Sequence, residues 1–319
     1  MKLTRVQVKD LRSTSGGKSI AVGGWGIIYP VTPKRQLATD IVLSGAYLLK
    51  APRVTPQAAD STAFETHLDE ITRRIKFEST YFESRMAVPR AIAERDSRFV
   101  GFLMREFSEG CYFTKKYSDG EEVNSLLQLK EFLNKESERN KVNVPKLKAI
   151  DRVEIIADMF TTLAKLHEHG LIVGDISGSN LVLQKKASRT GNLRVLFLDV
   201  DSFWHLGAPH PHGPSSTLHW RSPEEIKNPQ LGPTKQSDVY KAALMARRLL
   251  HQEANTGTSS FDIYSSRVAN ETLTLLGSPS LKERISKALN VRATIRPKAM
   301  ELAFEFKTLA EQLREQVLK

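Results

Sequence analysis

The residues best suited to chemistry lie in one run of the sequence, from His169 to Leu183, His-Gly-Leu-Ile-Val-Gly-Asp-Ile-Ser-Gly-Ser-Asn-Leu-Val-Leu. Within it, Asp175 and Asn180 stand five residues apart, after a predicted helix and before a predicted apolar strand. This spacing suits a carboxylate that orients a hydroxyl nucleophile and an amide oxygen that binds Mg²⁺. A turn stabilised by Asp and Asn side chains is the alternative. The order of helix, loop and strand favours the chemical interpretation.

A further carboxylate, Asp199, follows the apolar run Leu196-Phe-Leu. An Asp at the end of a buried strand costs free energy unless it binds a cation or hydrogen-bond donors. Asp residues are also common in ordinary hairpins, so this signal gains its weight from the neighbouring loop. Together with Asn180, Asp199 is a candidate metal ligand.

Near the N-terminus, the run Ala21-Val-Gly-Gly-Trp-Gly-Ile-Ile-Tyr29 lies between two strand-like segments. Its glycines, Gly23, Gly24 and Gly26, would let the backbone approach phosphate oxygens and direct N–H groups at them. A tight hairpin without a ligand has the same signature.

Lys50 ends the strand-like run Ala46-Tyr-Leu-Leu. A lysine at the end of a buried strand can bind a phosphate as a point charge. Most lysines at strand ends are simply solvated, so Lys50 becomes a candidate only in combination with the other motifs.

In this order, the glycine run, the strand lysine, the helix, the Asp-to-Asn loop and the strand-borne Asp resemble the protein-kinase superfamily. Ser222-Pro-Glu224 is similar to the Ala-Pro-Glu motif that ends the kinase activation segment. Ser237-Asp238-Val-Tyr240 is similar to the start of the long central helix, and Arg296-Pro297 falls where kinases place the arginine that pairs with that Glu. The resemblance covers residues 16 to about 305, nearly the whole chain.

The resemblance implies a role for each matching residue. Asp175 is the catalytic Asp, Lys50 contacts the α- and β-phosphates of ATP, and Asn180 and Asp199 are the Mg²⁺ ligands. The other residues expected to bind the nucleotide are Ala21, Gly23, Gly24, Gly26, Met104 and Phe107. Glu70, in preference to Glu78, pairs with Lys50. Glu224 and Arg296 form a buried ion pair, and Asp238 braces the catalytic loop.

Several positions depart from the kinase pattern. Ala21 replaces the first glycine, Leu48 replaces the small residue two before the lysine, and Gly174 replaces the arginine before the catalytic Asp. Ser177 replaces the lysine two after that Asp, and Asp201 replaces the glycine of Asp-Phe-Gly. The loop is similar to that of atypical bacterial and RIO-like kinases, so the chain resembles a divergent bacterial eukaryotic-like Ser/Thr kinase.

Three functions are compatible with these motifs. An ATP- and Mg²⁺-dependent kinase would transfer a phosphoryl group to Ser or Thr of a protein substrate. A pseudokinase would bind nucleotide weakly or act as a scaffold, which Leu48, Ser177 and Asp201 favour. A small-molecule kinase is the third, because Gly174-Asp175 is similar to the loop of aminoglycoside phosphotransferases, although Ser222-Pro-Glu224 argues against it.

The elements that must position these residues form an α+β pattern, with a small β-rich N-lobe containing one helix and a larger, mainly helical C-lobe. We expect a nucleotide-binding N-lobe at 1–104, a hinge at 105–110, and a C-lobe at 111–319 that holds the catalytic loop, the activation segment and a helical platform. The predicted strands are 3–8, 41–43, 87–89 and 98–104, and the predicted helices are 62–80, 121–137 and 151–169, with a charged connector at 138–148 and almost wholly helical sequence after 232.

Composition limits the location and the partners. The 319 residues carry a net charge of +11 and one cysteine, Cys111, which excludes a disulfide within the chain. With no apolar run at the N-terminus and none of membrane-spanning length, we expect a cytoplasmic protein. The basic balance permits nucleic-acid binding, but the Lys and Arg residues are spread along the chain, which favours an ordinary solvated surface. A protein substrate is what the kinase resemblance implies. The oligomeric state is not indicated.

The expected activation segment, Ser202 to Arg221, contains Ser215, Ser216 and Thr217. A phosphate orders a loop only where cations are ready to receive it. With Gly174 in place of the usual arginine, the sequence predicts that activity does not depend on phosphorylation of this segment.

Overall fold

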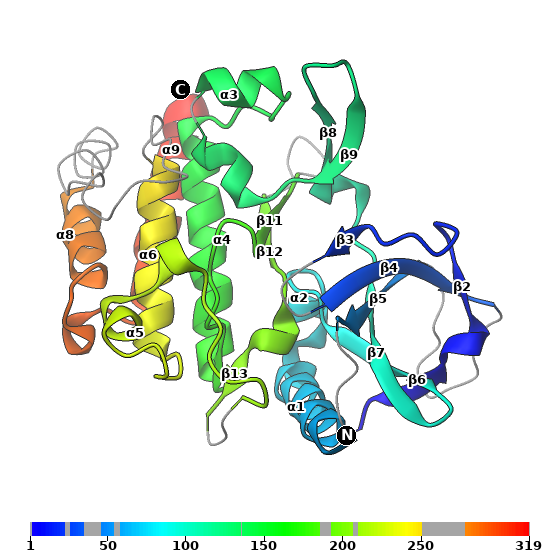
Figure 1. Ribbon diagram of the computed structural model, residues 1–319. Helices are drawn as coiled ribbons and strands as arrows, with labels where there is room; N and C mark the ends of the chain where they lie inside the picture. Colours follow the sequence, from blue (N-terminus) through cyan, green and yellow to red (C-terminus); the bar gives the residue numbers. More distant parts are fainter. Residues whose placement is uncertain are drawn as a thin grey trace. The chain divides into compact units, whose positions relative to one another are not determined.

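The computed structural model describes residues 2–22, 26–34, 46–53, 58–134, 136–185, 193–206, 210–250 and 278–318. The chain divides into two compact units, Met1–Phe107 and Ser108–Lys319 (Figure 1). The division falls within residues 105–110, the range expected for the hinge. The architecture is α+β, with a curled β-sheet in the first unit and the longest helices in the second.

The first unit is built on a seven-stranded sheet with the order β1-β6-β7-β5-β4-β2, and β3 pairs with β4. β1 is parallel to β6, and the other neighbours are antiparallel. The strands are β1 (Thr4–Gln7), β2 (Leu11–Ser13), β3 (Ala21–Val22), β4 (Gly26–Pro33), β5 (Tyr47–Pro52), β6 (Pro89–Arg95) and β7 (Arg98–Arg105). The predicted strand at 41–43 lies outside the described residues.

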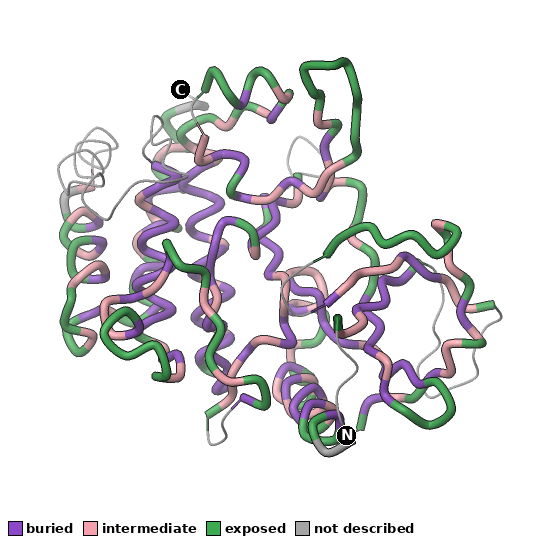
Figure 2. Tube along the Cα trace, viewed as in Figure 1, coloured by how far each residue is buried: buried purple, intermediate pink, exposed green. Residues whose placement is uncertain are grey.

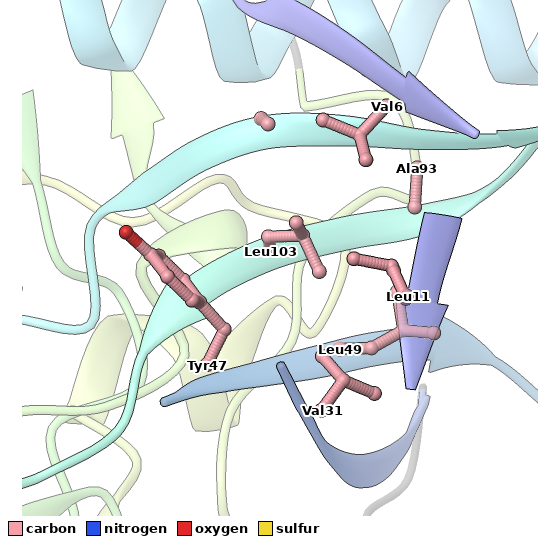
Figure 3. Packing of buried hydrophobic residues seen from close by; sticks show 8 residues of the cluster. Val6, Leu11, Val31, Tyr47, Leu49, Ala93 and Leu103 are labelled. Atoms are coloured by element: carbon pink, nitrogen blue, oxygen red, sulfur yellow. The ribbon is translucent and has the colours of Figure 1, made fainter. Parts of the chain in front are cut away.

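The sheet curls, so that side chains from several of its strands pack together on its inner face. Its buried cluster contains Val6, Leu11, Val31, Tyr47, Leu49, Ala91, Ala93 and Leu103 (Figure 3). Because side chains alternate across a strand, Tyr47 and Leu49 point into this cluster, while Leu48 and Lys50 of β5 belong to the opposite face. The apolar pattern of β5 therefore directs Lys50 away from the cluster.

Helix α1 (Ala58–Ile75) packs in the same unit and contacts β6. The side chains of Phe64, Leu68, Ile71 and Ile75 are buried, and the Phe64 ring meets the edge of Phe99 from β7 at 5.9 Å between centroids. These are the positions whose three- and four-residue spacing predicted a helix at 62–80. The helix begins four residues earlier than predicted, and a 3₁₀ turn at Lys76–Glu78 separates it from α2 (Ser79–Glu83).

The second unit is organised around α4, which packs against α6 and α9. Most of α4 and α6 is buried (Figure 2). The rings of Phe160 in α4 and Phe306 in α9 stack with centroids 5.8 Å apart. The helices are α3 (Glu136–Lys141), α4 (Ala149–Glu168), α5 (Pro223–Lys227), α6 (Lys235–Leu250), α8 (Pro279–Ala288) and α9 (Ala299–Leu318). None of the helices among the described residues is both long and apolar enough to span a membrane.

Three short antiparallel sheets complete the second unit. They pair β8 (Tyr112–Lys116) with β9 (Glu122–Leu126), β10 (Leu171–Ile172) with β13 (Trp204–His205), and β11 (Leu181–Gln184) with β12 (Arg194–Phe197).

In the two units together, further 3₁₀ turns lie at Val8–Asp10, Glu109–Cys111, Leu129–Leu133, Val200–Ser202, Leu218–Trp220 and Ala293–Ile295.

The helix predicted at 121–137 is wrong. That stretch is β9 followed by the 3₁₀ turn Leu129–Leu133. Gly120, at φ +88°, closes a tight turn between β8 and β9, and Leu127 donates its N–H to Cys111 and accepts one from Leu183. Backbone pairing with distant strands therefore overrides the local helical pattern. The connector predicted at 138–148 is also partly wrong, because α3 occupies Glu136–Lys141.

The expected ion pair between Glu224 and Arg296 is confirmed. Two guanidinium nitrogens of Arg296 each lie 2.7 Å from a carboxylate oxygen of Glu224. The Arg296 side chain has no exposed surface, and it also donates to the carbonyl oxygens of Gln236 and Asn290. Burial alone would raise the pKa of Glu224, but the Arg296 bonds hold this pKa below its ordinary value. The pair joins α5 to the segments around α6 and α8.

We predict that Arg296→Ala lowers the free energy of unfolding by about 3–5 kcal/mol, because it leaves the Glu224 carboxylate partly buried without its cation. The matched control is Arg284→Ala. Arg284 bonds Glu301 and Glu305, but its side chain is 37% exposed, so its removal should cost about 1 kcal/mol or less. Urea unfolding of both variants measures the difference, and equal losses would contradict the assignment.

The Glu224 pKa gives this prediction a pH dependence. A carboxylate with a lowered pKa in the folded state adds stability above its ordinary pKa of 4.5, and this stability is lost as the pH falls through the folded value. The difference between the parent and Arg296→Ala should therefore be largest near neutral pH and should shrink in acid.

Candidate active site

In the first unit, Lys50 is held by the sheet on both sides. It lies opposite Ile28 of β4 and Phe102 of β7, and only 6% of its surface is exposed. Two glycines pack closely around it. A Cβ on Gly26 would lie 3.2 Å from the Lys50 Cγ, and a Cβ on Gly101 would overlap the Lys50 carbonyl oxygen. Lys50 is therefore positioned by glycine backbone on both neighbouring strands.

Residues expected near the adenine site lie on the same face of the sheet as Lys50. Leu48 and Met104 lie directly opposite each other on β5 and β7, and both are buried. By the alternation of the strand, Leu48 shares the face of Lys50. Phe107, at the end of the first unit, is half-buried. The structure thus brings Lys50, Leu48 and Met104 together.

The two ends of the glycine run lie in two paired strands. Ala21 in β3 pairs with Ile28 in β4, and Gly26 begins β4 next to the stem of Lys50. Gly23 and Gly24 lie outside the described residues.

The Glu70 carboxylate is bound by its own helix. Arg73 Nε and Nη2 lie 2.7 and 2.6 Å from its oxygens, and Arg74 Nε lies 2.7 Å away. The Arg73 hydrogen bonds, with those of Arg74, lower the pKa of Glu70 to about 2. Glu78 lies in the 3₁₀ turn after α1 and is half-buried. The assignment of either residue as the partner of Lys50 stays a prediction.

In the second unit, the structure brings Asp175 and Asn180 together. The Nδ2 group of Asn180 donates to both the Oδ2 atom and the carbonyl oxygen of Asp175, each at 3.0 Å. Because the amide nitrogen is used in this way, the Asn180 Oδ1 remains an acceptor directed elsewhere. A cation is a suitable partner for that oxygen.

Asp199 lies beside Asn180 because β11 and β12 pair side by side. The Leu198 N–H donates to the Asn180 carbonyl oxygen at 2.9 Å, so the next residue, Asp199, follows directly at the strand end. Its backbone is left-handed, with φ +50°, and its carbonyl accepts the N–H and hydroxyl of Ser202. Asp tolerates this conformation better than most residues. Residues in such sparsely populated backbone conformations are often found at functional sites.

A buried carboxylate holds the start of the loop, as expected for Asp238. Asp238 has no exposed surface, and it accepts the N–H groups of Val173 and Gly174 at 2.8 and 2.9 Å. Its Oδ2 also lies 3.0 Å from His167 Nε2. Gly174 has φ +75°, and a Cβ there would lie 3.1 Å from Pro233. An arginine at this position would be strained in this backbone conformation.

A buried lysine that the sequence did not single out ties this loop to α5. Lys241 in α6 has no exposed surface, and its Nζ donates to the Gly174 carbonyl and lies 2.6 Å from Glu225 Oε1. The other Glu225 oxygen accepts the N–H and hydroxyl of Ser222. The sequence shows only a lysine among apolar residues of a helix. Because most lysines in helices are solvated, this pattern does not indicate a buried ion pair.

Thr217 makes a second contact that sequence reasoning missed. Its N–H and its hydroxyl lie 2.8 and 2.9 Å from Asp175 Oδ1. The side chain is exposed, yet it is not free in solvent, because it is a hydrogen-bond donor to the candidate catalytic carboxylate. The segment that contains Thr217 is therefore bound directly to the Asp175 loop.

No protein-family model matches this chain, and no curated protein matches its sequence. The candidate site accordingly stands on its residues and their geometry.

We predict that Gly101→Ala lowers the free energy of unfolding by more than about 3 kcal/mol. The added methyl group would overlap the Lys50 carbonyl, and the backbone has φ +149°, so β5 or β7 must shift. The matched control is Gly120→Ala, with φ +88° and no atom within 4 Å of the new Cβ, which should cost about 1–2 kcal/mol. Denaturant unfolding of both variants tests this, and equal destabilisation would refute the close packing around Lys50.

Proposed function

We propose that this chain is an ATP- and Mg²⁺-dependent phosphotransferase of the protein-kinase type that acts on Ser or Thr hydroxyls of a protein substrate. The observation that carries the proposal is the grouping of Asp175, Asn180 and Asp199 at one end of the β11–β12 pair. Asp175 is bound to Asn180 and Thr217, and Asn180 is joined through its backbone to Leu198. Phosphoryl transfer needs positioning and charge neutralisation more than covalent chemistry, and such a cluster can provide both.

The donor set fits Mg²⁺. This ion is usually bound by one or two carboxylates together with waters and substrate phosphates. Asp199 and the Asn180 Oδ1 would supply the protein oxygens. A site of few protein ligands suits a metal that arrives with a nucleotide. The bound ion would neutralise charge on the phosphates.

Asp175 is suited to orient the acceptor hydroxyl. Its Oδ1 already accepts an aliphatic hydroxyl, that of Thr217, at 2.9 Å. A substrate Ser or Thr presents the same chemical group, so the carboxylate can orient it and accept its proton. In this proposal the buried cation Lys50 binds the α- and β-phosphates.

We predict that Asp199→Asn removes most of the stabilisation that Mg²⁺–ATP gives the parent protein, because the amide lacks the negative charge that attracts the ion. At a hundred times its dissociation constant, the ligand should stabilise the parent by about 2.7 kcal/mol. The matched control is Asp96→Asn. Asp96 is another left-handed Asp, with φ +52°, in the tight turn between β6 and β7. Calorimetric titration and thermal unfolding with and without Mg²⁺–ATP give both readouts.

Equal Mg²⁺–ATP affinity in the parent and in Asp199→Asn would contradict the metal assignment. Transfer of labelled γ-phosphate to generic protein substrates, beside an Asp175→Ala variant, then tests catalysis. Nucleotide binding without Asp175-dependent transfer would identify the chain as a nucleotide-binding module instead.

The Thr217 contact gives a separate prediction about regulation. Thr217→Ser should keep the activity, because it retains the hydroxyl, and Thr217→Ala should lower kcat about tenfold, because a hydrogen bond to a charged group contributes about 1.5–3 kcal/mol. Thr217→Glu should be at least as damaging, because it sets a second carboxylate beside Asp175. The control is Ser215→Ala, at an exposed position in the same segment. An activating Thr217→Glu substitution would overturn the prediction that activity does not require phosphorylation of this segment.

A further inference from the structure

The second unit contains a polar recess of about 430 Å³ that none of the candidate catalytic residues lines. Its charged and aromatic lining consists of Lys115, Lys130, Glu131, His219, Trp220 and Arg248. Three of these side chains are permanent cations, and Glu131 is the single carboxylate among the lining residues. The recess therefore carries a net positive charge, which attracts anionic groups.

The recess lies next to the candidate catalytic loop. Gly178 and Ser179 form part of its wall, and both belong to the loop that runs from Asp175 to Asn180. On another side the wall is formed by the residues that follow Thr217, which binds Asp175 Oδ1. A polypeptide that presents a hydroxyl to Asp175 therefore has neighbouring residues within reach of the recess.

Close backbone packing places Lys130 at this position. The Lys130 N–H donates to the Gly178 carbonyl at 2.9 Å, and the Gln128 side chain donates to the Ser179 carbonyl at 2.6 Å. A Cβ on Gly178 would lie 3.0 Å from three atoms of Lys130, so a larger residue there would push the Lys130 backbone away. The backbone of Lys130 is thus fixed to the loop, and its exposed side chain extends from this fixed point.

The charged groups of the other two cations, Lys115 and Arg248, have partners within the recess. The Lys115 Nζ lies 3.2 and 3.3 Å from the two oxygens of Glu131, so one positive charge is balanced within the recess. The Arg248 guanidinium lies 4.0 Å above the Trp220 ring centre and donates to the His219 carbonyl. Such an ordered guanidinium loses little freedom when it binds a carboxylate or phosphate.

We propose that this recess binds an anionic side chain, a carboxylate or a phosphate, of the polypeptide whose hydroxyl is presented to Asp175. The substrate class is then acidic or already phosphorylated protein segments; this role rests on the proposed phosphotransferase function. A nucleic acid is the less suitable anion, because Trp220 is buried beneath Arg248 and does not offer its ring face for base stacking. The basic charge is local and lies beside a hydroxyl-binding carboxylate, as a substrate site requires.

The test measures binding without ATP. Fluorescently labelled Ser-containing peptides, identical except that the flanking residues are Glu, phosphoserine, Gln or Lys, are titrated with the full chain, and anisotropy is recorded. We expect the Glu and phosphoserine peptides to bind at least about tenfold more tightly than the Gln and Lys peptides, with the difference shrinking as the salt concentration rises.

Lys130→Glu should weaken binding of the acidic peptides about tenfold, equal to about 1.4 kcal/mol, and Lys130→Gln should weaken it less. Lys130 is exposed, so both variants should unfold at the same urea concentration as the parent. The matched control is Lys307→Glu, the same charge reversal at an exposed position of α9 outside the recess, which should leave binding unchanged.

Equal binding of all four peptides, or equal weakening by Lys130→Glu and Lys307→Glu, would overturn the proposal. It would also be overturned if an oligonucleotide of matched charge bound more tightly than the acidic peptides and lost affinity in Lys130→Glu. These outcomes are separate from the fate of the proposed function. Acidic-peptide selectivity without phosphoryl transfer keeps the recess and refutes the kinase, whereas transfer without selectivity refutes the recess alone.

Discussion

The candidate site depends on one buried carboxylate, that of Asp238. A carboxylate with no exposed surface is costly to bury unless donors surround it, and here it accepts the N–H groups of Val173 and Gly174 and lies beside His167 Nε2. These bonds fix the backbone immediately before Asp175. Since Asp238 belongs to α6, which packs on α4, the direction of the Asp175 loop is set by the helical core of the second unit.

Two buried cations then attach α5 to this core. Arg296 binds Glu224, and Lys241 binds the next residue, Glu225, and the Gly174 carbonyl. The two adjacent carboxylates thus have different partners: Glu224 binds Arg296 near the C-terminal helices, and Glu225 binds Lys241 beside the Asp175 loop. Removing one member of either pair leaves the charge of its partner buried and unpaired. This arrangement connects α5 to the Asp175 loop through residues already present in the chain.

The first unit uses a different means of positioning. Sheet alternation separates an apolar cluster, with Tyr47 and Leu49, from the opposite face, with Leu48 and Lys50. Glycine backbone then controls how closely the neighbouring strands approach Lys50. The same device recurs in the second unit, where Gly178 lets the backbone of Lys130 pack directly on the candidate catalytic loop. In both units the backbone of a lysine is packed closely against a glycine.

The sequence by itself determined the features that arise from local periodicity and from motif order: helices α1 and α4, the Asp175–Asn180 spacing, Asp199 at a strand end, and the Glu224–Arg296 and Asp238 contacts. It did not determine the β8–β9 hairpin, because β9 is held by pairing with β8 and the next residue, Leu127, bonds to Cys111 and to the distant Leu183. Nor did it reveal the Lys241 contacts, the bond of Thr217 to Asp175 or the cationic recess, or the binding of Glu70 by Arg73 and Arg74. Periodicity reports which face of an element is buried, whereas the partner of a polar side chain is decided by which elements pack together, and only the tertiary structure specifies that.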